Sequence, residues 1–177
     1  MPVSFANVTT SSMELTPMRV TFNSVDLGGT LGNVVLSFKY TKADIKADQL
    51  GTTVLDRRVS GLEITATTEV VEVENKDNWK VVFPHGTLIP TGTAAFDFLS
   101  AVGDGDLANS HELKLHPLSQ PNATVAYDFT FFKACASAES TITYGPTEQA
   151  RLKIVWNILP DTTVSPPKFC RYGDTTI

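Results

Sequence analysis

Residues 61–70, GLEITATTEV, alternate strictly between two kinds of side chain. One set of positions holds Leu62, Ile64, Ala66, Thr68 and Val70, and the other holds Glu63, Thr65, Thr67 and Glu69. Side chains alternate between the two faces of a β-strand, so this segment predicts a strand with an apolar and a polar face. The polar face is turned either to bulk solvent or to a water-filled channel, and the alternation does not choose between them.

Strand signals recur along the rest of the chain. They lie at residues 12–23, 32–40, 110–118, 124–134 and 150–159, with turn residues between them. Only one segment, at about residues 71–83, has helical spacing, and Pro84 and Gly86 end it. The expected fold class is mainly β: a β-sandwich or barrel with one flanking α-helix and a long inter-strand loop, formed by residues 1–177 as a single domain.

The long loop is expected at about residues 41–60. This part of the chain lies in YTKADIKADQLGTTVLDRRVSGL (40–62), which is polar, charged and without core periodicity. Connections of this length are uncommon inside a compact domain and are usually functional or disordered. We interpret the loop as an assembly arm, while a solvated loop would have the same composition.

The composition is that of an ordinary globular domain. Hydrophobic residues make up 42% of the 177 residues and charged residues 19%, and no stretch is apolar enough for a transmembrane helix. The first residues lack a secretion signal, so the expected compartment is the cytoplasm in which the chain is made. The net charge of −5 argues against a protein that grips nucleic-acid phosphates. Cys135 and Cys170 are expected to be thiols rather than a disulfide.

No segment carries a complete catalytic or metal-binding signature. The two histidines of HELKLH (111–116) are five residues apart, which differs from the zinc-protease spacing and puts them on opposite faces of a strand. The acidic turn GDGDLANSHE (103–112) has Ala108 where a calcium loop needs a ligand, and LGGTLG (27–32) is expected to be a hairpin or bulge turn. Cys135 with His116, or a serine with His85, lacks a nucleophile motif. We expect no enzyme activity and no cofactor or metal.

The order of features along the chain is more specific than any single motif. LGGTLGNVVLSF is followed by DIKADQLGTTVLDRRVSG, by the alternating strand and by the helix that contains Trp79. KLHPL, DFTFFKA, YGPTEQARLKIVWNILPD and FCRYGD then follow in the second half. In this order and spacing the chain resembles the tail tube (major tail) proteins of long-tailed bacteriophages, over almost its whole length.

The resemblance implies a structural virion protein without catalysis. Its subunits would form homohexameric rings that stack into the hollow tail tube, each lending strands to an inner β-barrel around the channel through which the genome is delivered. The protein would be made in the host cytoplasm and reside in the virion tail, with no membrane partner. Its partners would be further copies of itself, a tape measure protein, and tail terminator and initiator proteins. Double-stranded DNA would pass through the lumen without specific binding.

The resemblance also suggests roles for particular residues. The ring-stacking loop would use Asp44, Lys46, Asp48, Gln49, Gly51, Asp56, Arg57 and Arg58. The channel lining would consist of Glu63, Thr65, Thr67 and Glu69, with Asp128 and Thr130 as weaker candidates, although an ordinary outer surface has the same alternation. Acidic residues in a channel would repel the phosphate backbone and keep passing DNA from binding.

Two other functions fit the same pattern. A β-sandwich binding module, for capsid decoration or carbohydrate, would use exposed aromatic residues or an acidic loop at one end of the domain. The inner tube of a contractile injection machine would share the fold of the tail tube.

Overall fold

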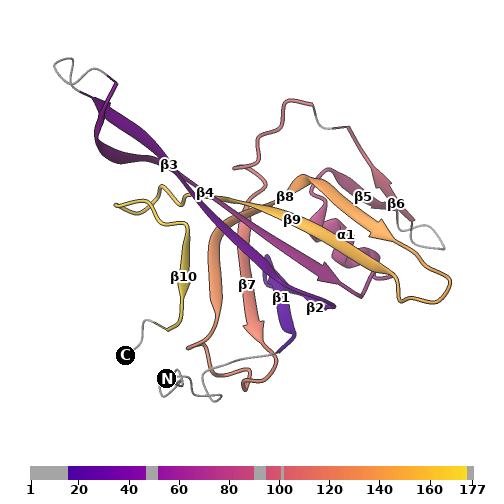
Figure 1. The fold of residues 1–177 in the computed structure, drawn as a ribbon. Coiled ribbons are helices and arrows are strands. Elements are labelled where there is room, and N and C mark those ends of the chain that lie inside the picture. Colours follow the sequence, from indigo (N-terminus) through magenta and orange to yellow (C-terminus); the bar gives the residue numbers. More distant parts are fainter. Residues whose placement is uncertain (1–15, 47–51, 90–94, 101, 175–177) are drawn as a thin grey trace.

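The computed structural model describes residues 16–46, 52–89, 95–100 and 102–174 (Figure 1). In this part the chain is mainly β with a single helix, as the sequence predicts. Its elements in chain order are β1 (Met18–Phe22), β2 (Val25–Gly29), β3 (Val35–Lys46), β4 (Val54–Val70), α1 (Lys76–Val82), β5 (Gly86–Ile89), β6 (Ala95–Phe98), β7 (His111–Pro117), β8 (Phe129–Thr143), β9 (Arg151–Leu159) and β10 (Cys170–Tyr172).

Eight of the strands form one antiparallel sheet. Its order is β2-β1-β7-β8-β9-β4-β3, with β10 paired to β8, while β5 and β6 form a separate hairpin. The sheet curls strongly: Thr30, directly after β2, forms a β-bridge with Val70 at the end of β4, and the Leu31 amide donates to the Glu69 carbonyl at 2.9 Å. Strands far apart in the sheet order therefore meet at one end, which gives the sheet a partly closed, barrel-like shape.

The core lies on the inner face of this curled sheet. The alternating residues of β4 are buried there together with those of β9, β7, β8 and β1, and Trp156 on β9 is completely buried against the Phe22 ring at a centroid distance of 4.7 Å. The fully buried side chains of the sheet and its flank include Val20, Leu27, Val73, Val82, Leu113, Leu115, Phe131, Leu152 and Ile154. The apolar face predicted for residues 61–70 is thus confirmed.

The helix is shorter than the sequence suggests. The expected segment began at about residue 71, but α1 begins at Lys76 because the Asn75 side chain accepts a hydrogen bond from the Asp77 amide and caps the first turn. The preceding residues form a turn, and the Trp79 indole donates to the Val73 carbonyl at 2.8 Å. The helix ends at Val82, just before Pro84, as predicted. No helix in the described ranges is long and apolar enough to cross a membrane.

The turn of the first hairpin lies outside LGGTLG, which was expected to be a hairpin or bulge turn. The turn is formed by Asn23 and Ser24, which have φ angles of 49° and 64° between the paired Phe22 and Val25. Two positive φ angles in a two-residue connection match the twist of a β-hairpin. The glycines of LGGTLG are partly inside β2, where Gly28 has φ 89°. The register between β1 and β2 shifts between Arg19 and Thr21, opposite Gly28, so the bulge alternative for LGGTLG is confirmed and the hairpin alternative is not.

The expected long loop is wrong in a more important way. Residues 41–46 belong to β3 and residues 54–60 to β4, so the described part of the segment is a β-hairpin. Nearly all of its residues are exposed on both faces, which removes the apolar alternation by which a strand is recognised in a sequence. The short strands β5, β6 and β10 were also missed, and β8 runs from residue 129 to 143 instead of 124 to 134.

Candidate assembly surface

The β3–β4 hairpin extends beyond the sheet that carries it. β3 pairs with β4 from Val35 opposite Thr67 to Lys46 opposite Val54, whereas β9 pairs with β4 only between Ile64 and Val70. The first ten residues of β4 have β3 as their only strand neighbour in the described structure. This part, residues 39–46 and 54–63, is called the arm here, and Figure 1 shows it projecting away from the other strands. A two-stranded ribbon of this kind is only marginally stable in water by itself.

Polar contacts across the arm fix its register. Arg57 Nε lies 3.1 Å from Asp44 Oδ1, and Lys39 Nζ lies 3.3 Å from Glu63 Oε2. A bulge at Ser60 shifts the pairing by one residue, and the Ser60 hydroxyl donates a hydrogen bond to the Thr41 carbonyl at 3.2 Å. Both ion pairs are exposed, and pairs of this kind contribute at most about 1 kcal/mol each. The arm is shaped by these contacts but gains little stability from them.

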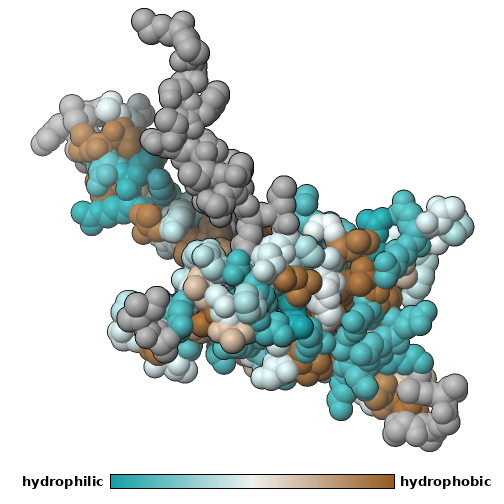
Figure 2. All heavy atoms as spheres, turned by 90° about the horizontal axis from the view of Figure 1, so that it is seen from below, coloured by the Kyte–Doolittle hydropathy of each residue, from teal (hydrophilic) through white to brown (hydrophobic). Residues whose placement is uncertain are grey.

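Large hydrophobic side chains are exposed along the arm and at its base. Phe38, Tyr40, Leu55 and Val59 are between 45% and 58% exposed. Phe38 and Tyr40 lie opposite Ile64 and Leu62, so they continue the core-facing side of the sheet beyond the core formed by the described residues. Figure 2, in which the arm lies on the left, shows hydrophobic residues in brown among hydrophilic ones in teal. Exposed hydrophobic side chains that are grouped in this way are typical of an interaction surface.

The predicted stacking residues fall mainly on this arm. Asp44, Lys46, Asp56, Arg57 and Arg58 lie on its two strands, whereas Asp48, Gln49 and Gly51 lie outside the described residues. Asp44 and Arg57 are paired with each other, and Lys46 and Arg58 form no ion pair within the described part of the chain. The arm therefore carries both internal pairs and cations that are open to another chain.

The polar side of β4 is placed as the alternation predicts. Glu63 is exposed, Thr65, Thr67 and Glu69 are half-buried, and the residues between them are buried. The same face also receives basic side chains that the single segment did not reveal. Lys39 pairs with Glu63, Arg151 lies 3.8 Å from Glu69, and Lys153 is opposite Glu69 on β9. This face is thus of mixed charge, not simply acidic.

Asp128 does not belong to such a face. Its side chain is only 2% exposed, with one carboxylate oxygen 2.6 Å from His116 Nδ1 and the other 2.8 Å from Lys114 Nζ. Asp128 precedes β8 and lies against the outward side of β7. The chain that connects β7 to β8 covers this side, and the carbonyl of Gln120 in this connection lies 3.3 Å from His116 Nε2. The prediction that Asp128 lines a channel is wrong, because a buried ion pair faces no lumen. Thr130 is half-buried, between Lys114 and Arg171 in register.

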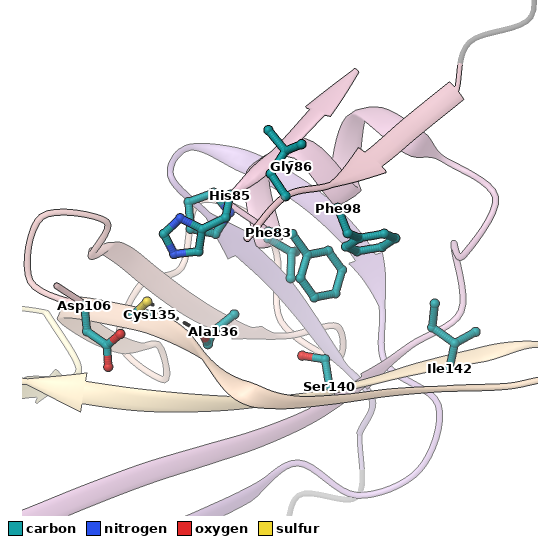
Figure 3. A pocket seen from close by; sticks show the side chains of 12 residues that line it. Phe83, His85, Gly86, Phe98, Asp106, Cys135, Ala136, Ser140 and Ile142 are labelled. Atoms are coloured by element: carbon teal, nitrogen blue, oxygen red, sulfur yellow. Dashed lines mark hydrogen bonds between the residues drawn. The ribbon is translucent and has the colours of Figure 1, made fainter. Parts of the chain in front are cut away.

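A cavity of about 470 Å³ has titratable and nucleophilic side chains in its lining. It lies between Phe83, His85 and Phe98 on the side of α1, β5 and β6, and Cys135 and Ser140 on β8 (Figure 3). Burial raises the pKa of the Cys135 thiol, and the charge of Asp106 raises it further. His85 Nδ1 lies 3.4 Å from Asp104. A raised pKa lowers the fraction of Cys135 that is thiolate at neutral pH, and the thiolate is the nucleophilic form of a cysteine.

The remaining histidines have separate surroundings. His111 is exposed, and its ring is T-shaped to that of Phe22 with the two ring centroids 5.8 Å apart, whereas His116 is buried against Asp128. His116 is therefore bonded elsewhere and does not serve Cys135. Cys135 and Cys170 are both free thiols. Within the described ranges, no three His, Cys, Asp or Glu side chains are grouped so that they could hold a metal ion.

Sequence reasoning missed the aromatic cluster around α1. Trp79, Phe83, Phe96 and Phe98 contact one another with centroid distances of 5.0 to 6.4 Å. The signal that could have revealed it is the short run AFDF, whose two phenylalanines are two positions apart and therefore lie on the same side of a strand.

No protein-family model matches the chain, and no curated protein matches it either.

Proposed function

We propose that this protein is a structural subunit that self-assembles into stacked hexameric rings and so forms the tube of a bacteriophage tail. The observation that carries the proposal is the arm, a ribbon ten residues long on its β4 side that leaves the sheet with exposed apolar side chains. Burial of this surface against further copies would supply the free energy that the isolated ribbon lacks.

The open sheet edge next to the arm supports association. β3 is the last strand in the sheet order, and its outer edge has no partner among the described strands. Unpaired backbone groups at a sheet edge are a template for pairing with another chain, and proteins that remain monomeric usually block such edges. Neither β3 nor the start of β4 contains a proline. Edge pairing between neighbouring subunits would build a ring, and the arm would reach the next ring.

A conduit for the genome is consistent with the polar side of β4. Glu63, Thr65, Thr67 and Glu69 are proposed to line the channel, together with the basic side chains that accompany them. Glu63 is paired with Lys39 and Glu69 with Arg151, so these two cations are not free to hold phosphates. A lining of this kind would let DNA pass without binding it, in keeping with the overall charge of −5.

The proposed function includes no catalytic step. The cavity beside Cys135 is also lined by His85, Asp106 and Ser140, and the raised pKa of this thiol argues against a nucleophilic role. The same cavity would serve a binding module, which is why the experiment has to distinguish assembly from ligand binding.

The test is negative-stain electron microscopy of the purified protein over a concentration series, with its mass measured in solution. Hollow rings at low concentration and tubes at high concentration are the expected result. Particles that remain monomeric at every concentration would contradict self-assembly and would favour the binding-module alternative. Solid or open fibres without a central channel would contradict the tube.

A further inference from the structure

The arm has a counterpart at the opposite end of the molecule. In Figure 1 the arm projects on one side of the sheet, and α1, β5 and β6 lie on the other side. The last residue of β6, Phe98, is exposed, and so are Leu99, Val102 and Leu107 in the segment that follows; these four side chains are 57% to 96% exposed. One chain thus carries two separate apolar surfaces that are both open in the described structure.

The second surface is hollowed. The cavity of about 470 Å³ opens beside it and is lined by Phe83, Phe98, Leu99 and Ile142 on its apolar side. Asp106 and Ser140 also line this cavity (Figure 3). The Ser140 hydroxyl is buried and has no hydrogen-bond partner in the described part of the chain. We call Phe98, Leu99, Val102, Asp104, Asp106 and Leu107, with this cavity, the acceptor surface.

The charges of the two surfaces are opposite. The described arm carries five basic and three acidic side chains. Residues 95–110, which contain the acceptor surface, have no lysine or arginine but contain Asp97, Asp104 and Asp106. Lys42 and Lys46 occupy alternate positions of β3 that follow Phe38 and Tyr40, so they share the apolar side of the arm, and neither has an ion pair among the described residues.

We propose that the arm of one subunit docks on the acceptor surface of another copy of this chain, an inference that rests on the proposed self-assembly. Phe38 and Tyr40 pack against Phe98, Leu99 and the mouth of the cavity. Lys42 and Lys46 lie beside Asp104 and Asp106, where opposite charges set the register of the contact. Because two different surfaces meet, the contact is heterologous, and it repeats from subunit to subunit until a ring closes or a stack extends.

The test is a charge swap between the two surfaces, made in the full chain. Lys42→Glu/Lys46→Glu reverses the arm, and Asp104→Lys/Asp106→Lys reverses the acceptor surface. Each double variant is expected to raise the concentration needed for assembly by roughly tenfold or more, because like charges then face each other. The fourfold variant, with the charges exchanged, is expected to assemble again within a few-fold of the wild-type concentration. Circular dichroism shows whether every variant is folded.

A matched control separates this contact from a general effect of net charge. Glu74→Lys/Glu112→Lys changes the charge as much as the acceptor variant does, at exposed residues outside both surfaces. Combined with the arm reversal, it should fail to restore assembly. Restoration by this control as well would overturn the inference, because net charge alone would then explain the result.

The outcomes also distinguish this inference from the proposed function. If rings and tubes form and depend on the arm, while the acceptor variant assembles normally and the swap restores nothing, the acceptor lies elsewhere and the inference is overturned with the tube intact. If the swap restores an oligomer that is neither a ring nor a tube, the contact stands and the tail-tube proposal is contradicted. A wild-type chain that remains monomeric at every concentration overturns both.

Discussion

The indole Nε1 of Trp156 donates a hydrogen bond to the hydroxyl of Thr68 at 2.9 Å, between two side chains that are completely buried. This bond explains why a threonine occupies an inward position of β4 among apolar residues. Trp156 is the largest fully buried side chain of the core, and its N–H needs a partner there.

Replacing Thr68 with valine is therefore expected to destabilise the fold although the shape is nearly conserved. The Trp156 N–H would remain buried without an acceptor, which costs about 1–3 kcal/mol of the free energy of unfolding. Urea denaturation followed by tryptophan fluorescence measures the loss. Thr65→Val is the matched control on the polar side of the same strand and should change the free energy by less than about 0.5 kcal/mol. Equal effects of the two variants would contradict the importance of the buried bond.

Asp128→Asn should destabilise the packing of the β7–β8 connection against β7. The amide keeps the size of the carboxylate but removes the charge that holds Lys114 and His116, leaving a buried pair broken on one side. We expect a loss of about 2–4 kcal/mol in the free energy of unfolding, near the lower range for a broken buried ion pair. Asp97→Asn, at an exposed residue of β6, is the control and should be nearly neutral. A similarly small effect at Asp128 would show that the pair contributes no net stability.

The thiol of Cys135 makes stability depend on alkaline pH. Its pKa is raised above the ordinary value of 9.0 by burial and by Asp106, so above that pH the folded state holds a proton that the unfolded state releases. The free energy of unfolding therefore falls as the pH rises through 9.0. Cys135→Ala should flatten this decrease when urea denaturation is compared between neutral and alkaline pH. Cys170, whose pKa is also raised by burial, supplies part of the remaining slope. Identical slopes for wild type and Cys135→Ala would contradict the prediction.

Arg57→Glu/Arg58→Glu should block the stacking of rings without unfolding the subunit. Both residues are exposed on the arm, and only Arg57 takes part in an ion pair of the described structure. The monomer should lose less than about 1 kcal/mol, because an exposed pair contributes little. Electron microscopy should show rings or monomers instead of tubes at concentrations where the wild type forms tubes. Normal tubes from this variant would remove the arm from the stacking contact.

Glu63→Lys/Glu69→Lys tests the polar side of β4. Each reversal places a lysine beside a cation, Lys39 or Arg151, so it adds positive charge to this face, although Arg151 keeps its ion pair with Glu148. Tubes are expected to form, while DNA passage should slow, because the added positive charge can hold phosphates. The rate of DNA release from particles carrying the variant measures this. Normal release from intact tubes would show that these two residues do not line the channel.

The sequence predicted the parts of the fold that have one dry and one wet side. The sequence predicts the strand at residues 61–70 because Ile64 and Ala66 alternate with Glu63 and Thr65. In the structure Ile64 and Ala66 are buried, and the two polar residues lie on the other face. The arm was not recognised as strands, because water on both faces leaves no periodic pattern. Its content of β-branched residues, such as Val54 and Val59, was the weaker signal that remained.

The candidate sites were predictable only where a residue's neighbours are close in sequence. Asp128 was assigned to a polar face because a strand signal surrounds it, but its burial depends on Lys114 and His116, which come from another strand. The basic residues beside Glu69 come from β9, more than eighty positions later. Such cross-strand partners follow from the sheet order, which a single sequence does not specify.

β4 runs without interruption from Val54 in the arm to Val70, which forms the β-bridge with Thr30. A force that pulls on the arm along its axis therefore enters the β4–β9 ladder parallel to the strands, where the hydrogen bonds between Ile64 and Val70 and their partners bear it together. Strands loaded in this direction must slide past each other before any bond is lost, whereas a sideways force would open the bonds one at a time. The subunit is thus built to resist axial tension more strongly than bending of the arm.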